Sequence, residues 1–342
     1  LAALGRHQEA LAAEEEALAL CRDLAAANPA HQPRLADALN SYGNSLAALG
    51  RHQEALAAEE EALALCRDLA AANPAHQPVL ADALNGYGNS LAALGRHQEA
   101  LAAEEEALAL CRDLAAANPA HQPRLARVLN GYADSLRDLR RLREALAARQ
   151  KALALCRDLA AANPAHQPDL ADALAKYGAD LTNLGRRQEV LAALEETLAL
   201  CRDLAAANPA HQLRLADALN NYGACLAAIL GQDREALATF EEALALCRDL
   251  AAADPVYQSY LAHTLDNCGI SLRDQGRHSE ALTYDRERLE LYAILARSDP
   301  DLYEKTYQRL LAELRRTYDL RGDQSTSISL HLRRDNQGSD QP

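Results

Sequence analysis

Apolar and polar positions follow a pattern that repeats along most of the chain. Residues 33–50 carry apolar side chains at steps of four, three, four and three, which places them on one face of an α-helix. Those positions are Leu35, Leu39, Tyr42, Leu46 and Leu49. Pro33 suits the first turn of this helix, where its missing N–H is not needed, and Gly50 suits the cap that ends it.

A second helix is predicted from about Arg51 to Ala72. Its apolar side is narrow and rich in alanine, and it consists of Ala55, Ala58, Ala62, Leu65, Cys66 and Leu69. Asn73 ends the helix because the proline that follows disfavours helical backbone in the residue before it. Near the middle, Glu59–Glu61 form a triplet that we expect on a solvated outer face, although Glu59 lies closest to the apolar side.

The helix pair recurs with a period of 45 residues and one slip to 46 before Gly231. The turn glycines that mark the period are Gly5, Gly50, Gly95, Gly185, Gly231 and Gly276. Glycine and proline interrupt the pattern too often for a continuous coiled coil. A single helix pair cannot bury both of its apolar faces, whereas stacked pairs can. The chain is therefore predicted to be all-α, an α-solenoid of stacked antiparallel helix pairs.

The segment LNSYGNSLAALGRHQEALAAEEEALAL, residues 39–65, resembles the tetratricopeptide repeat. Small residues recur at the positions of Gly43 and Ala55, where two helices of that repeat approach closely. The unit is about eleven residues longer than the 34-residue repeat, which is about three helical turns. It therefore resembles the long-helix class typified by kinesin light chain. The resemblance implies a right-handed superhelix.

The chain departs from that family at one position. The family usually has an aromatic residue where this chain has Glu14, Glu59 and Glu104. We therefore expect a thinner core of alanine and leucine in the early units. The predicted division of the chain is a partial first repeat at 1–32, six helix pairs at 33–297, a capping helix at 298–322 and a disordered tail at 323–342.

The resemblance also implies a binding surface, because the first helix of each tetratricopeptide pair lines a concave groove. Asparagine can donate and accept hydrogen bonds together, which suits the backbone of an extended peptide. Aspartate in the same stripe would favour a basic ligand. The matching positions here are Asp37, Asn40, Asn44, Asp82, Asn85, Asn89, Asn130, Asp134, Asp172, Asp217 and Asn220.

The fourth unit, counted from the partial first repeat, is a basic island in an acidic chain. Arg140 replaces the turn glycine, and Arg149–Lys151 replaces the glutamate triplet. We expect Arg149–Lys151 to form a partly exposed electrostatic seam between Glu104–Glu106 and Glu195–Glu196.

Charge and composition exclude several classes of function. The net charge is −14, with one Phe and no Trp, which argues against nucleic acid as a partner. No run reaches the roughly 18 apolar residues of a membrane span. Six of the eight cysteines recur once per unit, so stacked neighbours would lie about 10 Å apart, beyond disulfide reach. Reduced cysteines favour a cytoplasmic location.

No catalytic constellation is visible, and we expect no cofactor and no bound metal. Histidines also recur once per unit, but none has a neighbour at a metal-ligand spacing. We therefore predict a non-enzymatic scaffold that binds an extended segment of a partner protein. Leu1 lies inside a unit and the chain has no methionine, so we expect a piece of a longer protein. Two alternatives remain: the repeat sensor region of a larger nucleotide-binding signalling ATPase, and the regulatory repeat region of a fused protease.

Overall fold

A computed structural model describes residues 2–298 and 300–319, and these residues form helices and no strand. Six antiparallel helix pairs follow one another between α1 (Ala2–Ala27) and α14 (Pro300–Asp319). The first helices of the pairs are α2 (Gln32–Ala48), α4 (Gln77–Ala93), α6 (Gln122–Asp138), α8 (Gln167–Asn183), α10 (Gln212–Cys225) and α12 (Gln258–Asp274). The second helices are α3 (His52–Ala72), α5 (His97–Ala117), α7 (Leu142–Ala162), α9 (Arg187–Ala207), α11 (Asp233–Ala253) and α13 (His278–Ser298).

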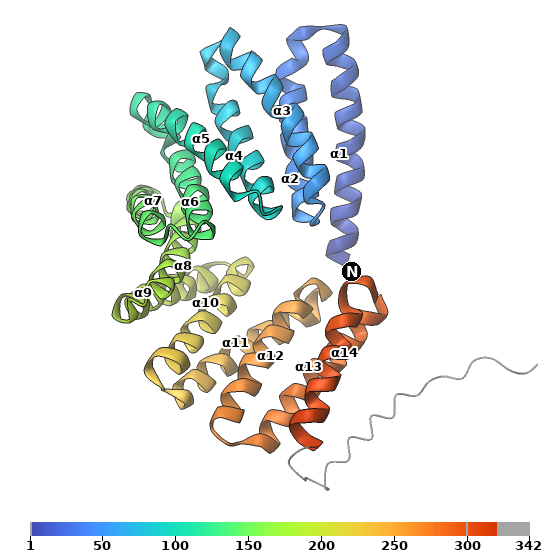
Figure 1. The fold of residues 1–342 in the computed structure, drawn as a ribbon, viewed down its shortest axis with the longest axis vertical. Helices are drawn as coiled ribbons and strands as arrows, with labels where there is room; N and C mark the ends of the chain where they lie inside the picture. The colour runs from blue at the N-terminus through green and yellow to red at the C-terminus, as the bar shows by residue number, and fades with distance from the viewer. Residues whose placement is uncertain (1, 299, 320–342) are drawn as a thin grey trace, which may run out of the picture.

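The helix pairs stack into a curved solenoid. Each helix packs on the helices before and after it, and α2, α4 and α6 also contact one another along the inside. Figure 1 shows the stack as an arc, with α7 and α9 on its outside and α6, α8 and α10 on its inside. The first helices therefore form the concave wall, as the resemblance implied.

The turn inside each pair is a glycine cap. Gly50 has a φ of +74°, and the Arg51 amide donates to the carbonyl of Leu46 at 2.9 Å, which closes the end of α2. Before Gly231 the chain has one extra residue, and a π-helical turn, η6 (Leu226–Leu230), takes it up. The equivalent bond there runs from Gln232 to Leu226, one residue further than in the other turns.

The turn between successive pairs is built by an asparagine. The side-chain oxygen of Asn73 accepts a hydrogen bond from the amide of Ala75 at 3.0 Å, and Pro74 opens a short 3-10 turn. Five turns of this kind are described: η1 (Pro29–His31), η2 (Pro74–His76), η3 (Pro119–His121), η4 (Pro164–His166) and η5 (Pro209–His211). In a sixth, η7 (Pro255–Tyr257), Asp254 takes the place of the asparagine.

One of the turns predicted from the sequence, at Gly5, is absent from the structure. Gly5 is not a turn, because α1 runs without a break from Ala2 to Ala27. At the other end, α14 packs on α13 through Leu289, Leu310 and Leu314, within the segment expected to form a cap. The predicted tail at 323–342 lies outside the described residues.

The eight cysteines are free, as expected, and all except the half-buried Cys21 are buried. Burial raises the pKa of Cys66 and Cys111 to about 11, so these thiols are protonated at neutral pH. They therefore serve as small apolar side chains of the core. Within the described part of the chain, no helix combines the length and apolar character that crossing a bilayer requires.

Arg140 takes the place of the turn glycine and has a φ of +60°. A side chain is strained in this left-handed conformation by roughly 1–2 kcal/mol. Replacing Arg140 with glycine should therefore raise the free energy of unfolding by about 1 kcal/mol. Chemical denaturation measures the change.

Gly95 supplies the matched control for that substitution. Its φ is +77°, and a Cβ added to it would meet no atom within 4 Å, so Gly95→Ala tests backbone strain alone. We expect this variant to lose about the stability that Arg140→Gly gains. A loss of stability in both variants would contradict the strain at Arg140.

Candidate functional site

The predicted stripe lies on the concave side of the first helices, opposite their buried leucines. Asp37, Asn44, Asn89, Asp172 and Asp217 are exposed, whereas Asn220 is buried. The other five are half-buried: Asn40, Asp82, Asn85, Asn130 and Asp134.

Two hollows open along this surface, each with a volume of about 470 Å³. The first lies over α4, α6 and α8, and the second over α8, α10 and α12. Asp172 lines both of them, so they are neighbouring parts of one groove. Predicted residues that line the first are Asn85, Asn89, Asn130, Asp134 and Asp172, and those that line the second are Asp172, Asp217 and Asn220. Asp37, Asn40, Asn44 and Asp82 line neither hollow.

Much of the acidic stripe is neutralised within the protein. Both carboxylate oxygens of Asp82 accept hydrogen bonds from Arg124 at 2.9 Å. Asp172 forms an ion pair with Arg214 of the next unit through a single carboxylate oxygen, Oδ1. In both pairs the arginine follows the aspartate by 42 residues, which is three fewer than the period of the repeat. This spacing was not identified from the sequence.

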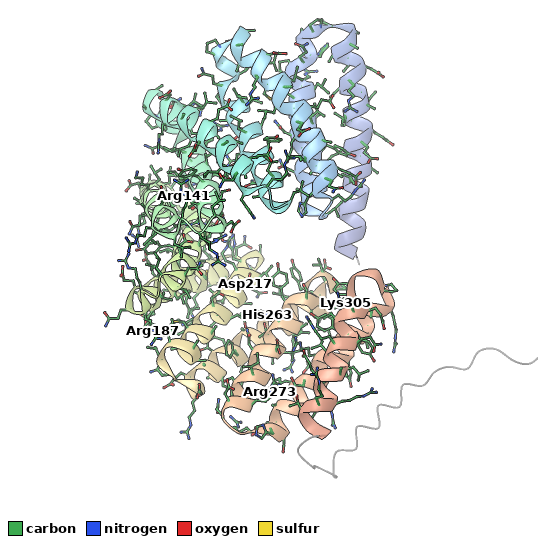
Figure 2. All side chains as sticks on the ribbon, viewed as in Figure 1. Arg141, Arg187, Asp217, His263, Arg273 and Lys305 are labelled. Atoms are coloured by element: carbon green, nitrogen blue, oxygen red, sulfur yellow. The ribbon has the colours of Figure 1, made fainter. Side chains whose placement is uncertain are left out.

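Asp37 and Asp217 have no ion pair among the described residues. Val79 and Tyr260 stand where the other units place the partner arginine, which explains the difference. Although the residue is exposed overall, partial desolvation of its carboxyl group in the second hollow raises the pKa of Asp217, with His263 and Arg214 opposing the shift. Figure 2 shows Asp217 and His263 near each other on the inner side of the arc.

Five of the six predicted asparagines divide into two groups. Asn130 and Asn220 already serve the fold: Asn130 accepts from Arg149, and Asn220 donates to Thr264 at 2.9 Å. A second group makes no side-chain hydrogen bond among the described residues: Asn85 and Asn89 line the first hollow, and Asn44 is exposed at the same position as Asn89 one unit earlier. These three amides can therefore receive a ligand.

The side chain at one repeated position of the second helices, that of Glu59 in α3, is buried in the core of the described units. The position is occupied by Glu59, Glu104, Arg149, Leu194, Phe240 and Asp285, all at most 8% exposed. The expectation of a solvated glutamate triplet is therefore wrong for Glu59 and Glu104, while Glu60 and Glu61 are exposed. Gly43 explains the difference, because it leaves space in the facing helix that the methylene groups of Glu59 fill.

Glu59 and Glu104 are buried without a charged partner of opposite sign. Burial raises the pKa of each to about 7, and the nearby hydroxyls of Ser90 and Ser135 offset only part of the shift. The Oε2 atom of each has no hydrogen-bond partner in the described structure. These are the buried ionisable groups that the sequence reasoning assigned to the surface.

Arg149 is 0% exposed, which corrects the predicted seam. Its guanidinium donates to Asp180 at 2.9 Å, to Asp134 at 2.6 Å, and to the carbonyl and side-chain oxygens of Asn130 at 3.0 and 2.9 Å. Burial by itself raises the pKa of Asp134, but Arg149 and Lys176 outweigh it, so the pKa lies below its usual value. The arginine is neutralised inside the core and makes no pair with the glutamate triplets.

The exposed glutamates of the second helices instead form ion pairs with arginines of the preceding unit, which reduces the repulsion between stacked glutamates. Five such pairs join second helices, with nitrogen to oxygen distances of 2.5–2.9 Å: Arg22–Glu61, Arg67–Glu106, Arg157–Glu196, Arg202–Glu242 and Arg248–Glu287. Lys151 interrupts this ladder, because it stands where Arg112 would meet a glutamate. The basic unit thus breaks a row of outer ion pairs.

No group of three or more His, Cys, Asp or Glu side chains in the described ranges is arranged to hold a metal ion. The side chains that line the groove carry amide, carboxylate and guanidinium groups. Such groups bind other polar and charged groups by hydrogen bonds and ion pairs.

Comparison with known proteins identifies the repeat. Sequence profiles of the tetratricopeptide repeat match residues 34–113 and 261–296. No curated protein sequence matches the chain.

Several solved structures share the fold. BtubC (BKLC) from P. vanneervenii is 19% identical, with a TM-score of 0.58 over 71% of this chain and 92% of that chain. The APC/C hetero-tetramer Cut9-Hcn1 is 16% identical, with a TM-score of 0.54 over 88% of this chain and 46% of that chain. Both show the same stacking of helix pairs. A Podosopora anserina putative kinesin light chain with nearly identical TPR-like repeats has 18% identity and a TM-score of 0.45, covering 63% of this chain and 95% of that one.

Proposed function

Because the chain is a tetratricopeptide repeat protein, we propose that it is a protein-interaction scaffold that holds an extended segment of a partner protein in its groove. The observation that carries the proposal is the first hollow, where α4, α6 and α8 present amides and carboxylates to one space of about 470 Å³. Helices pack about 10 Å apart, and an extended chain advances about 3.3 Å per residue. Each unit would therefore meet about three residues of the partner.

The charge of the groove narrows the chemistry of the partner. Asp82, Asp134 and Asp172 carry basic partners of this chain, so they attract a basic ligand less than the sequence predicted. Asp37 and Asp217 keep free carboxylates at the two ends of the stripe. We propose a segment with polar backbone contacts along the groove and basic residues at defined places.

We infer that this role is non-enzymatic. A nucleophilic cysteine needs a lowered pKa, whereas burial raises the pKa of Cys156 and Cys201 to about 11. The neighbours of these thiols are core side chains. A cytoplasmic location remains a prediction from the sequence.

The test is an affinity capture with and without the free amides. Replacing Asn44, Asn85 and Asn89 together with alanine should abolish or strongly weaken capture, because the partner backbone would lose its hydrogen bonds. Asn130 is left unchanged because it holds Arg149, and its loss would disturb the fold.

The matched control replaces Glu60, Glu105 and Glu195, which are exposed at the same position of the second helices α3, α5 and α9. Bound proteins are identified by mass spectrometry, and affinities are measured on the purified pairs. Equal capture by the two triple variants would contradict a role for the groove.

A further inference from the structure

Three oxygen atoms converge beside Gly131 in the first hollow. A Cβ added to Gly131 would lie 3.2 Å from Oε1 of Glu104, and 3.5 and 3.7 Å from Oδ1 of Asn85 and Asn89. Glu104 is 1% exposed, and its other oxygen has no hydrogen-bond partner in the described structure. Gly131, Asn85 and Asn89 line the hollow, and Glu104 lies just behind them, with no side chain at Gly131 to cover its Oε1 atom.

The same arrangement occurs one unit earlier. A Cβ on Gly86 would lie 3.4 Å from Oε1 of Glu59 and 4.0 Å from Oδ1 of Asn44. Glu59 is 2% exposed and likewise has an oxygen without a partner. Glycine occupies this position in these two units, whereas the three units that bury Arg149, Leu194 and Phe240 place Lys176, Asn221 and Asn267 there.

Arg149 shows what such a spot accepts. Its guanidinium donates to Asn130 and Asp134, which are the equivalents of Asn85 and Asn89 one unit on. Asn85 and Asn89 present their acceptor oxygens beside Glu104, but Glu104 has a carboxyl group where the next unit has the guanidinium of Arg149. Acceptors without a donor are costly when buried. A donor-rich cation from outside would complete the spot.

We propose that Glu104 with Asn85 and Asn89, and Glu59 with Asn44, bind two lysine or arginine side chains of the partner segment. This inference rests on the groove function proposed above. The two sites are one unit apart, so the two basic residues would stand about three positions apart in an extended chain. A metal ion fits less well, because the described residues offer no cluster of His, Cys, Asp or Glu ligands.

The test uses a library of extended peptides of about a dozen residues, the length that four units would hold. Each peptide carries two arginines three positions apart, and a matched peptide carries citrulline, which is uncharged and nearly the same shape. Binding is measured by fluorescence polarisation. The wild type should bind the best arginine peptides about tenfold or more tighter than their citrulline partners.

Two variants separate the buried carboxylates from their exposed neighbours. Glu59→Gln with Glu104→Gln should lose the preference for arginine while binding citrulline peptides as the wild type does. Glu60→Gln with Glu105→Gln should keep the preference. An arginine preference that survives the loss of Glu59 and Glu104 would overturn the inference.

Gly131→Ala gives a second, independent measurement. Alanine suits the interior of α6 better than glycine, which offsets the small shift that a Cβ 3.2 Å from Oε1 imposes on Glu104, and the melting temperature is measured beside binding as a check of the fold. Its methyl group would stand in the opening beside Glu104, so the preference for the second arginine should disappear. Unchanged preference in this variant would also count against the site.

The failures of the two proposals are distinguishable. Peptides that bind without preference for arginine, but are lost when Asn44, Asn85 and Asn89 become alanine, would leave the groove function standing and overturn this inference. If no peptide binds the wild type and affinity capture also finds no groove-dependent partner, both fail.

Discussion

Replacing Arg149 with leucine should lower the free energy of unfolding by about 3–5 kcal/mol. Asp180 is 2% exposed, and the guanidinium of Arg149 neutralises it at 2.9 Å. Without the arginine, that carboxylate stays buried with only Arg137 beside it, at 3.8 Å, and the side-chain oxygen of Asn130 loses its donor. The cost of the variant is therefore mainly the cost of the groups left behind.

The next unit shows how the loss can be repaired. Where α7 and α8 have Arg149 and Asp180, the following pair of helices has Leu194 and Cys225, which pack in one apolar cluster. The double variant Arg149→Leu with Asp180→Cys should recover most of the lost stability, because apolar groups of similar volume replace a buried ion pair at little cost.

Chemical denaturation followed by circular dichroism measures these changes. Arg157→Leu is the surface control, because Arg157 pairs with Glu196 while half-exposed and should cost about 0–1 kcal/mol. If the single variant at Arg149 were as stable as the double variant, Asp180 would not depend on the arginine.

Raising the pH from 5 to 8 should destabilise the protein by up to about 3 kcal/mol for each of Glu59 and Glu104. Their pKa of about 7 in the folded state exceeds the ordinary value of 4.5, so the folded state binds the proton more tightly than the unfolded state. The stabilisation is complete below pH 4.5 and is lost as the pH rises through 7. Asp134 and Asp138 add to the shift at Glu104.

Replacing Glu59 and Glu104 with glutamine should remove most of this pH dependence. Glutamine keeps the shape of the protonated acid, so the variant should be more stable than the wild type at pH 8. The variant with Glu60 and Glu105 changed to glutamine provides the background slope, since those side chains are exposed. An equal slope in the two double variants would place the titrating groups elsewhere.

These two results would describe a core whose polarity changes along the stack. The early units bury a carboxyl group and the middle unit buries an arginine, whereas the units of Leu194 and Phe240 bury apolar side chains at the same position. We expect the early units to be the ones whose stability, and whose affinity for a basic segment, respond to pH near neutrality.

The sequence by itself determined the period, the helices and the turns of this protein. Its apolar positions at steps of three and four predict α2 and α3 because the period of an α-helix is local to each helix. Gly50 and Asn73 likewise shape their turns through bonds to residues within a few positions. The repeat also predicts left-handed backbone at Arg140, because Arg140 occupies the position that the turn glycine has in the other units.

Only the tertiary structure decided which polar side chains are buried and what they meet. Glu59 and Glu60 are adjacent residues of one helix, yet Glu59 enters the core because Gly43 of the facing helix leaves room for it. The partners of Asp82 and Arg149 belong to other helices, and their choice depends on how successive pairs cross. A helical period places a side chain on a face, but the neighbouring helix decides whether that face is closed, charged or open to a ligand.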